Sequence, residues 1–274
     1  MMVDRRVRIG NQSARSASEP TEPFAYALEN GFDAFEWFPD KSETGEGWEE
    51  ADLPPRTRHK CRAEAWLRRM RVSVHAPSRI NPLLPGAMSR LDETLAFCHD
   101  VGAALLNLHL WEDQGVEAYA DAVLPLIRRV ADAGLTLAIE NTPLTGPDPF
   151  NALFAALRKR RSPPDRAGMC LDVGHANLFG ATRNDYLAYV DRIEPSVPII
   201  HVHLHENVGD RDSHLTLFTG PADQDPAGVQ GLADRLKRRN FSGSLILEQW
   251  PEPPSLLNAA RDRLLRLFEG SAGP

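Results

Sequence analysis

Short runs of apolar and β-branched residues recur along the whole chain. Each run is followed by a longer stretch in which apolar positions return every three or four residues. The short runs predict β-strands and the longer stretches predict amphipathic helices. The strand candidates lie at 7–10, 34–38, 72–76, 105–110, 135–140, 168–173, 198–204 and 244–248. Helical spacing is clearest at 86–101, 116–133, 150–160 and 229–239.

This alternation predicts an α/β fold, namely a single (β/α)8 TIM barrel over residues 1–274. Parallel strands need helical crossovers, and eight such units close into a barrel. The 274 residues are 42% hydrophobic and 25% charged, without a long Gly/Ser/Pro linker that would separate domains. In this fold, functional residues gather at the C-terminal ends of the strands. A polar segment at about 206–224 is expected to form a lid-like loop.

Nearly every predicted strand ends in a side chain that can bind a metal or exchange a proton. In chain order these residues are Glu36, His75, His109, Glu140, Asp172, His203 and Glu248. Consecutive members are about one β/α unit apart, so a closed barrel would bring all of them to one rim. Each position taken alone is better explained by a solvated strand end, but the regular spacing favours a shared site.

Four of these residues form the expected metal site: Glu140, Asp172, His203 and Glu248. Three carboxylates and one imidazole offer hard oxygen ligands and one nitrogen, a set that suits Mn²⁺, Zn²⁺, Mg²⁺, Co²⁺ or Fe²⁺. Without a cation, three converging carboxylates would repel one another and some would stay protonated. We therefore expect one divalent metal at the strand ends.

Further His and Asp residues extend this donor set, and with them up to three metals fit the sequence. They are His75, His109, His175, Asp212 and His214. The first two are expected beside the carboxylate of the fifth strand and the other three on the far side. Asp212 and His214 fit a solvated lid loop equally well.

The remaining histidines have simpler explanations. His201, His203 and His205 alternate along one strand and share a face, so they lie at different depths. We expect His201 in the core and His205 at the rim. His59 and His99 fall in charged helical stretches and are expected at the surface.

The charge balance argues against a nucleic-acid-binding surface, because 38 acidic residues outnumber 31 basic ones and the net charge is −7. The three cysteines are widely spaced, which suits a reducing cytoplasm better than a disulfide framework. The first 20 residues contain no signal-peptide core, and no apolar run is long enough to cross a membrane. We expect a cytoplasmic protein outside the membrane, and homo-oligomerisation stays open.

Five motifs, taken in order, resemble the xylose-isomerase-like TIM-barrel superfamily. They are Val-His-Ala-Pro at 74–77, Ile-Glu-Asn at 139–141, Leu-Asp-Val-Gly-His at 171–175, His-Val-His-Leu-His-Glu-Asn at 201–207 and Ile-Leu-Glu at 246–248. This superfamily includes sugar isomerases and epimerases, inosose dehydratase-type enzymes and endonuclease IV. The resemblance spans the second to the eighth strand and is much more specific for the superfamily than for one activity.

The likeness to sugar isomerases and epimerases implies a metal-dependent enzyme acting on a small sugar, sugar phosphate or polyol. In those members one divalent metal is held by residues that match Glu140, Asp172, His203 and Glu248. The resemblance implies an enediolate mechanism in which Glu140 and Glu248 exchange protons on opposite faces of the substrate. Ketose epimerases of this kind carry a second glutamate where this chain has Gly146.

The expected substrate contacts combine the resemblance with position at strand ends. They are Glu36, His175, His205, Glu206 and Trp111. His175 and Glu206 are implied by the resemblance to hold substrate hydroxyls. Trp37, Trp111 and Trp250 lie near strand ends and fit either an apolar wall for a sugar face or packing at the barrel rim.

The likeness to endonuclease IV implies the alternative of a multi-zinc phosphoesterase of the AP endonuclease type. Endonuclease IV binds three zincs through nine ligands, and matching residues occur at all nine places: His75, His109, Glu140, Asp172, His175, His203, Asp212, His214 and Glu248. The aromatic residue that follows His-Ala-Pro in such nucleases is Ser78 here. Binding of duplex DNA needs cations and an apolar wedge, so this difference and the acidic surface argue against DNA as the substrate.

Overall fold

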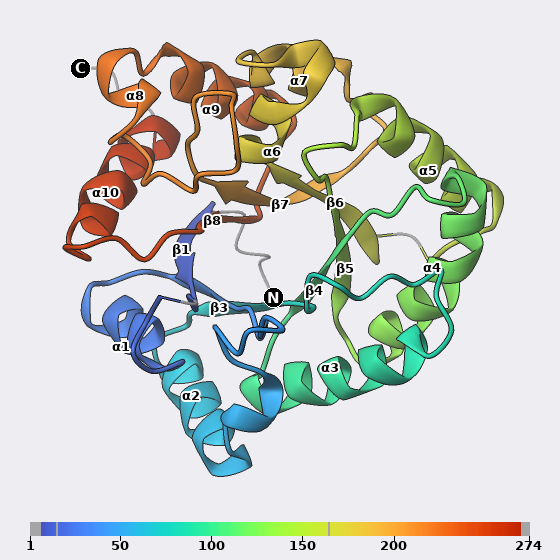
Figure 1. The fold of residues 1–274 in the computed structure, drawn as a ribbon, viewed down its shortest axis with the longest axis horizontal. Helices are drawn as coiled ribbons and strands as arrows, with labels where there is room; N and C mark the ends of the chain where they lie inside the picture. The colour runs from blue at the N-terminus through green and yellow to red at the C-terminus, as the bar shows by residue number, and fades with distance from the viewer. Residues whose placement is uncertain (1–6, 15, 164, 270–274) are drawn as a thin grey trace.

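Eight parallel strands form a closed barrel in the computed structural model, which describes residues 7–14, 16–163 and 165–269. The strands are β1 (Arg8–Gln12), β2 (Ala34–Trp37), β3 (Arg71–His75), β4 (Leu105–His109), β5 (Thr136–Glu140), β6 (Ala167–Asp172), β7 (Ile199–Leu204) and β8 (Ser244–Leu247). They pair in chain order, and β1 also pairs with β8 and so closes the sheet. Figure 1 shows the helices as a ring around these strands.

The strands are buried on both faces, because helices cover the outside and side chains fill the inside. In β5, Glu140 points into the barrel, so Ala138 shares its face and Leu137 and Ile139 point toward the helices. All four residues are buried, as are nearly all positions of the other strands. At the closure, Gly10 pairs with both Ala34 and Ile246, and a Cβ at Gly10 would collide with the Ala34 carbonyl oxygen.

The helices carry the apolar spacing that the sequence shows. They are α1 (Glu22–Glu29), α2 (Pro55–Leu67), α3 (Ala87–Val101), α4 (Val116–Asp132), α5 (Pro147–Lys159), α6 (Val173–Leu178), α7 (Tyr186–Arg192), α8 (Pro221–Gln224), α9 (Ala227–Arg238) and α10 (Leu256–Glu269), with 3₁₀ turns at Glu50–Asp52 and Gly180–Thr182. In α4, Tyr119, Val123, Ile127 and Val130 are buried three or four residues apart against the barrel.

The predicted (β/α)8 barrel is confirmed, with each of the eight strands within a few residues of its expected position. The helix expected at 150–160 begins earlier, at Pro147, because a proline suits the first turn of a helix. The ends of the predicted domain, 1–6 and 270–274, lie outside the described residues. None of the helices in the described part of the chain has the length and apolar character needed to cross a bilayer.

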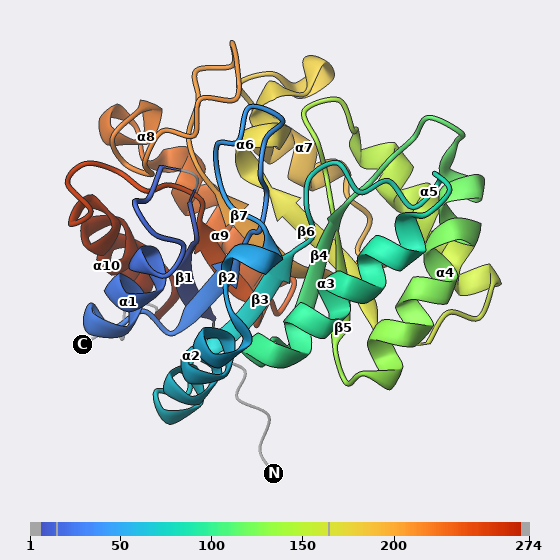
Figure 2. The same ribbon diagram turned by 60° about the horizontal axis from the view of Figure 1, so that its bottom comes forward.

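The loop between β7 and α9 rises above the carboxyl ends of the strands and is drawn in orange at the top of Figure 2. Glu206 and Leu215 pair through two backbone hydrogen bonds of 2.9 and 2.8 Å, so the loop folds back on itself. The Glu206 carboxylate also accepts hydrogen bonds from the backbone N–H groups of Phe218 and Ala222. The chain therefore fixes this loop with its own contacts, and its role as a lid stays a prediction.

Candidate functional site

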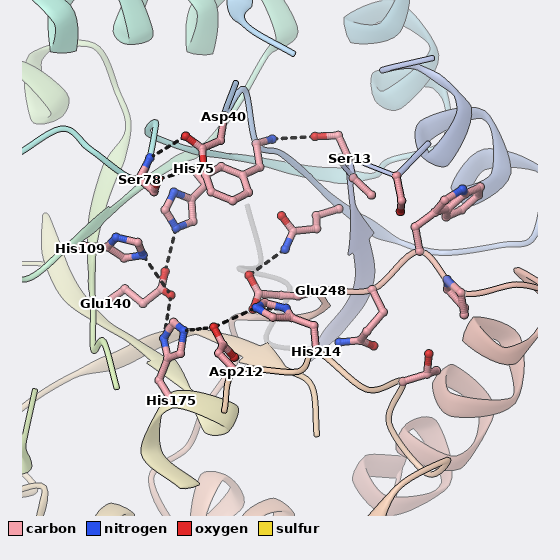
Figure 3. A pocket seen from close by; sticks show the side chains of 18 residues that line it. Ser13, Asp40, His75, Ser78, His109, Glu140, His175, Asp212, His214 and Glu248 are labelled. Atoms are coloured by element: carbon pink, nitrogen blue, oxygen red, sulfur yellow. Dashed lines mark hydrogen bonds and ion pairs between the residues drawn. The ribbon is translucent and has the colours of Figure 1, made fainter. Parts of the chain in front are cut away.

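A cavity of about 540 Å³ opens at the carboxyl ends of the strands. Seven residues predicted for the site line it: His75, His109, Glu140, His175, Asp212, His214 and Glu248. Figure 3 shows their side chains directed toward one another. His75, His109 and Glu140 are the last residues of β3, β4 and β5, so the parallel barrel itself delivers them to one place.

The four residues expected to hold a metal meet around one atom, Nδ1 of His203. This nitrogen lies 2.9 Å from Glu248 Oε1, 3.3 Å from Glu140 Oε2 and 3.8 Å from Asp172 Oδ2. His203 and Asp172 are fully buried, and Glu140 is 1% exposed. The structure thus brings all four members of the expected set together at one histidine nitrogen.

The donor atoms at this point fit a divalent cation. Asp172 Oδ2 and His203 Nδ1, 3.8 Å apart, are buried side-chain atoms that have no hydrogen-bond partner. Buried polar atoms are normally paired, so two neighbouring unpaired atoms indicate a ligand. Three carboxylates and one imidazole are hard or intermediate donors, as divalent Mn, Mg, Co, Fe and Zn prefer.

A second cluster of possible metal ligands shares Glu140 with the first. His75 Nε2 lies 3.1 Å from Glu140 Oε2, and His109 Nε2 lies 3.6 Å from Glu140 Oε1. Nδ1 of His75 contacts the Ala76 carbonyl oxygen, which can only accept, so Nδ1 carries the proton. In the neutral ring, Nε2 then presents a lone pair to a carboxylate, and a proton or a metal must lie between them.

A third cluster of possible metal ligands lies where the β7–α9 loop contacts α6. Asp212 Oδ2 lies 3.2 Å from His175 Nε2 and 3.1 Å from His214 Nε2. His214 stacks on His205, with 4.0 Å between the ring centroids. Asp212 and His214, which the sequence left open as a solvated loop, thus join a cluster of four potential ligands that the chain forms at the cavity edge.

The Asp-Val-Gly-His motif places His175 because β6 runs directly into α6. Asp172 caps this helix, and its Oδ1 accepts a hydrogen bond of 2.6 Å from the His175 backbone N–H. The intervening Gly174 leaves room for the ring of His205, with which a Cβ would collide. One strand end therefore supplies a carboxylate and, one turn later, an imidazole.

The electrostatics of the site are those of carboxylates facing imidazoles. Burial would raise the pKa of Glu140, but the facing His203, His75 and His109 outweigh it and hold this pKa well below its usual value. Burial lowers the pKa of His175, yet Asp172 and Asp212 outweigh this and raise it to about 10. In the metal-free protein, protons on imidazoles therefore balance the charge of the carboxylates.

His214 and Glu36 follow the same pattern. Burial lowers the pKa of His214, but the hydrogen bond to Asp212 and the nearby Glu248 raise it to about 9. Burial would raise the pKa of Glu36, but the facing imidazoles of His203 and His201 outweigh it and hold it below its usual value. Both groups are therefore charged at neutral pH when no metal is present.

Of the five expected substrate contacts, only His175 lines the cavity. Glu36 lies too deep: it is fully buried on β2 and contacts His201 and His203. The Glu206 carboxylate is used inside the β7–α9 loop, because it accepts backbone N–H groups there. These positions do not support substrate contacts by Glu36 and Glu206.

His205 and Trp111 also lie away from the cavity lining. His205, expected at the rim, is 2% exposed and faces Asp172, with its Nε2 3.2 Å from Oδ1. Trp111 packs against the core and donates its Nε1–H to the Ile80 carbonyl oxygen at 3.1 Å, so it belongs to rim packing. Trp37 is buried in the core, whereas Trp250 does line the cavity.

Several polar residues around the site were not predicted from the sequence to belong to it. Gln12 donates a hydrogen bond of 2.7 Å to Glu248 Oε1, and Asn107 donates one to Glu140 Oε2. Ser78 donates from its backbone N–H and hydroxyl to Asp40 at 3.2 and 2.9 Å. A signal existed for Asn107, because it lies two residues before a strand-end histidine and so shares its face.

Comparison with known proteins gives consistent matches. A family model described as xylose isomerase-like TIM barrel matches residues 24–267. A curated protein from Sinorhizobium fredii, "Uncharacterized protein y4fM", is 26% identical over 238 residues, which cover 72% of each chain. The crystal structure of a D-tagatose 3-epimerase-like protein has a TM-score of 0.71 at 18% identity and covers 96% of this chain and 98% of its own. The structure of IOLI protein with a binding zinc atom has a TM-score of 0.68 at 11% identity, with coverage of 96% and 98%.

Proposed function

Because the chain belongs to the xylose isomerase-like TIM barrel family, we propose that it is a divalent-metal-dependent enzyme that isomerises or epimerises a small sugar, sugar phosphate or polyol. The observation that carries this proposal is the convergence of Glu140, Asp172 and Glu248 around Nδ1 of His203 at the cavity. The sugar-epimerase and zinc-binding descriptions of two structural neighbours support the substrate class and the metal.

The chemistry follows from what these residues can hold and move. A divalent cation held by Glu140, Asp172, His203 and Glu248 would polarise the carbonyl and the neighbouring hydroxyl oxygen of the sugar, which acidifies the adjacent C–H. Gln12 holds Oε1 of Glu248, so the unpaired Oε2 is the atom free to take the proton. Glu140, which also lines the cavity from another strand, would return a proton that it shares with the facing His75, and an enediolate connects the two steps.

The cavity walls suit hydroxyl groups. Hydroxyl and amide side chains of Ser13, Ser16, Ser78, Thr216 and Gln249 line it. These groups can both donate to and accept from sugar hydroxyls. The position of the second glutamate of ketose epimerases is occupied by Gly146, and a Cβ there would collide with Phe179. The expected reaction is therefore one that needs only two carboxylates.

A second candidate function, metal-dependent phosphoester hydrolysis, is favoured by the two further clusters of possible metal ligands. His75 and His109 flank Glu140, while His175 and His214 share Asp212. A carboxylate shared between neighbouring groups suits a multinuclear centre, which stabilises the attacking and leaving oxygens of a phosphoester. The net charge of −7 does not favour a DNA substrate.

Metal content and product together test the two candidates. The first is supported by about one tightly bound metal per chain and by conversion of a keto or aldo sugar in a panel that includes phosphates and an abasic DNA oligonucleotide. Asp212→Ala combined with His214→Ala should leave the sugar conversion in place but abolish a three-metal hydrolase. Three tightly bound zincs with cleavage of a phosphoester would select the second candidate. A protein that binds no metal contradicts both.

A further inference from the structure

Glu36 is a buried carboxylate that lies below the cavity and contacts two imidazoles of β7. Its Oε2 lies 2.9 Å from His201 Nε2 and its Oε1 lies 2.8 Å from His203 Nε2. Glu36 and His203 are 0% exposed and His201 is 1% exposed, so solvent does not provide alternative partners. Each carboxylate oxygen is thus assigned to one histidine.

This arrangement dictates where the histidine protons lie. His201 forms a hydrogen bond with Glu36, and His203 Nε2 lies at ion-pair distance from its Oε1. An ionised carboxylate has no hydrogen to donate, so at these distances both Nε2 atoms must carry one. For a neutral His203, the other ring nitrogen, Nδ1, then has a lone pair. That lone pair is directed to the place where Glu140, Asp172 and Glu248 converge, at 3.3, 3.8 and 2.9 Å. The lone pair of a neutral ring is repelled by carboxylate oxygens unless a cation lies between them.

We propose that Glu36 is a positioning residue that holds His203 in its Nε2–H tautomer and so makes Nδ1 a metal-binding atom. The inference rests on the proposed metal-dependent function. It adds to that function a residue that does not line the cavity and is not itself a proposed metal ligand. A carboxylate that accepts the second N–H of a metal-binding histidine fixes the ring and raises its basicity. His201 contacts Oε2 of Glu36 and leaves Oε1 to face His203, so it helps to fix the orientation of the carboxylate.

Glu36→Gln separates this role from simple packing. The amide has nearly the same size, but it accepts at one atom and donates at the other. If its oxygen accepts from His201, its NH₂ faces Nε2 of His203, and the His203 proton must move to Nδ1. That proton would occupy the metal-binding position. Glu36→Gln is therefore expected to weaken Zn²⁺ binding by about 10- to 100-fold.

The matched control is Glu50→Gln. Glu50 is also a buried carboxylate, at 9% exposure, and it accepts a hydrogen bond of 2.8 Å from Thr94 Oγ1. It lies outside the cavity lining. Zn²⁺ affinity of the full chain is measured by competition with a chromogenic chelator. We expect Glu50→Gln to stay within about twofold of the original protein, because it touches none of the four ligands.

A second measurement reads the tautomer directly. Nitrogen-15 NMR of the Zn²⁺-loaded protein labelled at histidine distinguishes a ring that binds the metal through Nδ1 from one that binds it through Nε2, without any activity assay. The original protein is expected to show His203 with Zn²⁺ on Nδ1 and a hydrogen on Nε2, and Glu36→Gln to lose this signal at the same Zn²⁺ concentration. If Glu36→Gln fails to fold, the tautomer of the original protein still decides.

The outcomes separate this inference from the proposed function. Equal Zn²⁺ affinity in a folded Glu36→Gln variant, or a His203 ring that binds Zn²⁺ through Nε2 in the original protein, overturns the role of Glu36 alone. An equally large loss of affinity in Glu50→Gln also overturns it, because the effect would then be a general cost of losing a buried carboxylate. An original protein that does not bind Zn²⁺ overturns both the inference and the proposed function.

Discussion

Glu248→Gln is the sharpest perturbation of the proposed catalytic site. Gln12 donates to Glu248 Oε1 at 2.7 Å, and an amide oxygen can still accept this hydrogen bond. The size of the side chain is unchanged, and in the metal-free protein a facing imidazole such as His203 can release one proton to match the lost negative charge. The fold is therefore expected to persist while the unpaired Oε2 loses its ability to accept a proton.

The expected loss follows from the role of that atom. A positioned general base contributes about 100- to 10,000-fold to a rate, which corresponds to about 3 to 5 kcal/mol of transition-state stabilisation. The assay measures kcat for the sugar that the original protein converts, together with deuterium incorporation from D₂O at the substrate carbon. Both should fall in Glu248→Gln by the same factor, because both depend on transfer of that proton.

The control is Glu252→Gln, a change of the same kind at an exposed position four residues further along the chain. Its kcat should stay close to that of the original protein. Metal content is measured in parallel, since Glu248 is also a proposed ligand. Full activity of Glu248→Gln with an unchanged metal content would refute both roles assigned to this carboxylate.

Three further results are expected for the metal-free protein, for metal removal and for the barrel closure. In the metal-free protein the pKa values of His175 and His214 are raised from 6.5 to about 10 and about 9, so their stabilisation is complete below pH 6.5 and is lost as the pH rises through 9 to 10. The Tm of chelator-treated protein should fall over this window and fall less in Asp212→Asn, and a Tm that rises there contradicts the assignment. Chelation of a metal present at 100 times its Kd should lower the Tm by about 5 to 10 °C, since binding then contributes about 2.7 kcal/mol, and an unchanged Tm counts against the site. Gly10→Ala should destabilise the protein by about 1–3 kcal/mol in urea unfolding because its Cβ would collide with a strand carbonyl, whereas Gly180→Ala, with open space around it, should be neutral.

The barrel and the convergence of the candidate ligands were predictable because both depend on spacing along the chain. Strands of a parallel barrel all end at one rim, so His75, Glu140 and Asp172 had to meet once each was recognised as a strand end. The same argument brought His109 to that rim. No knowledge of side-chain conformation was needed for this step.

The finer assignments could not be made from spacing, because depth and side-chain direction decide them. Glu36 and Glu206 carry the residue type expected for substrate contacts, but one is buried below the cavity and the other caps backbone N–H groups in its own loop. Trp111 likewise finds a backbone acceptor at the rim. Gln12 was not recognised because its partner, Glu248, is 236 residues away.

The hydrogen bond between Gln12 and Glu248 has a consequence for synthesis of the protein in the cell. Its two residues lie just where the first and the last strand of the barrel meet, 236 residues apart. A nascent polypeptide still attached to the ribosome can pair its early strands, but the ring stays open until the eighth strand has emerged. The proposed metal site would then form only after the eighth strand has been made, because Glu248 directly follows that strand.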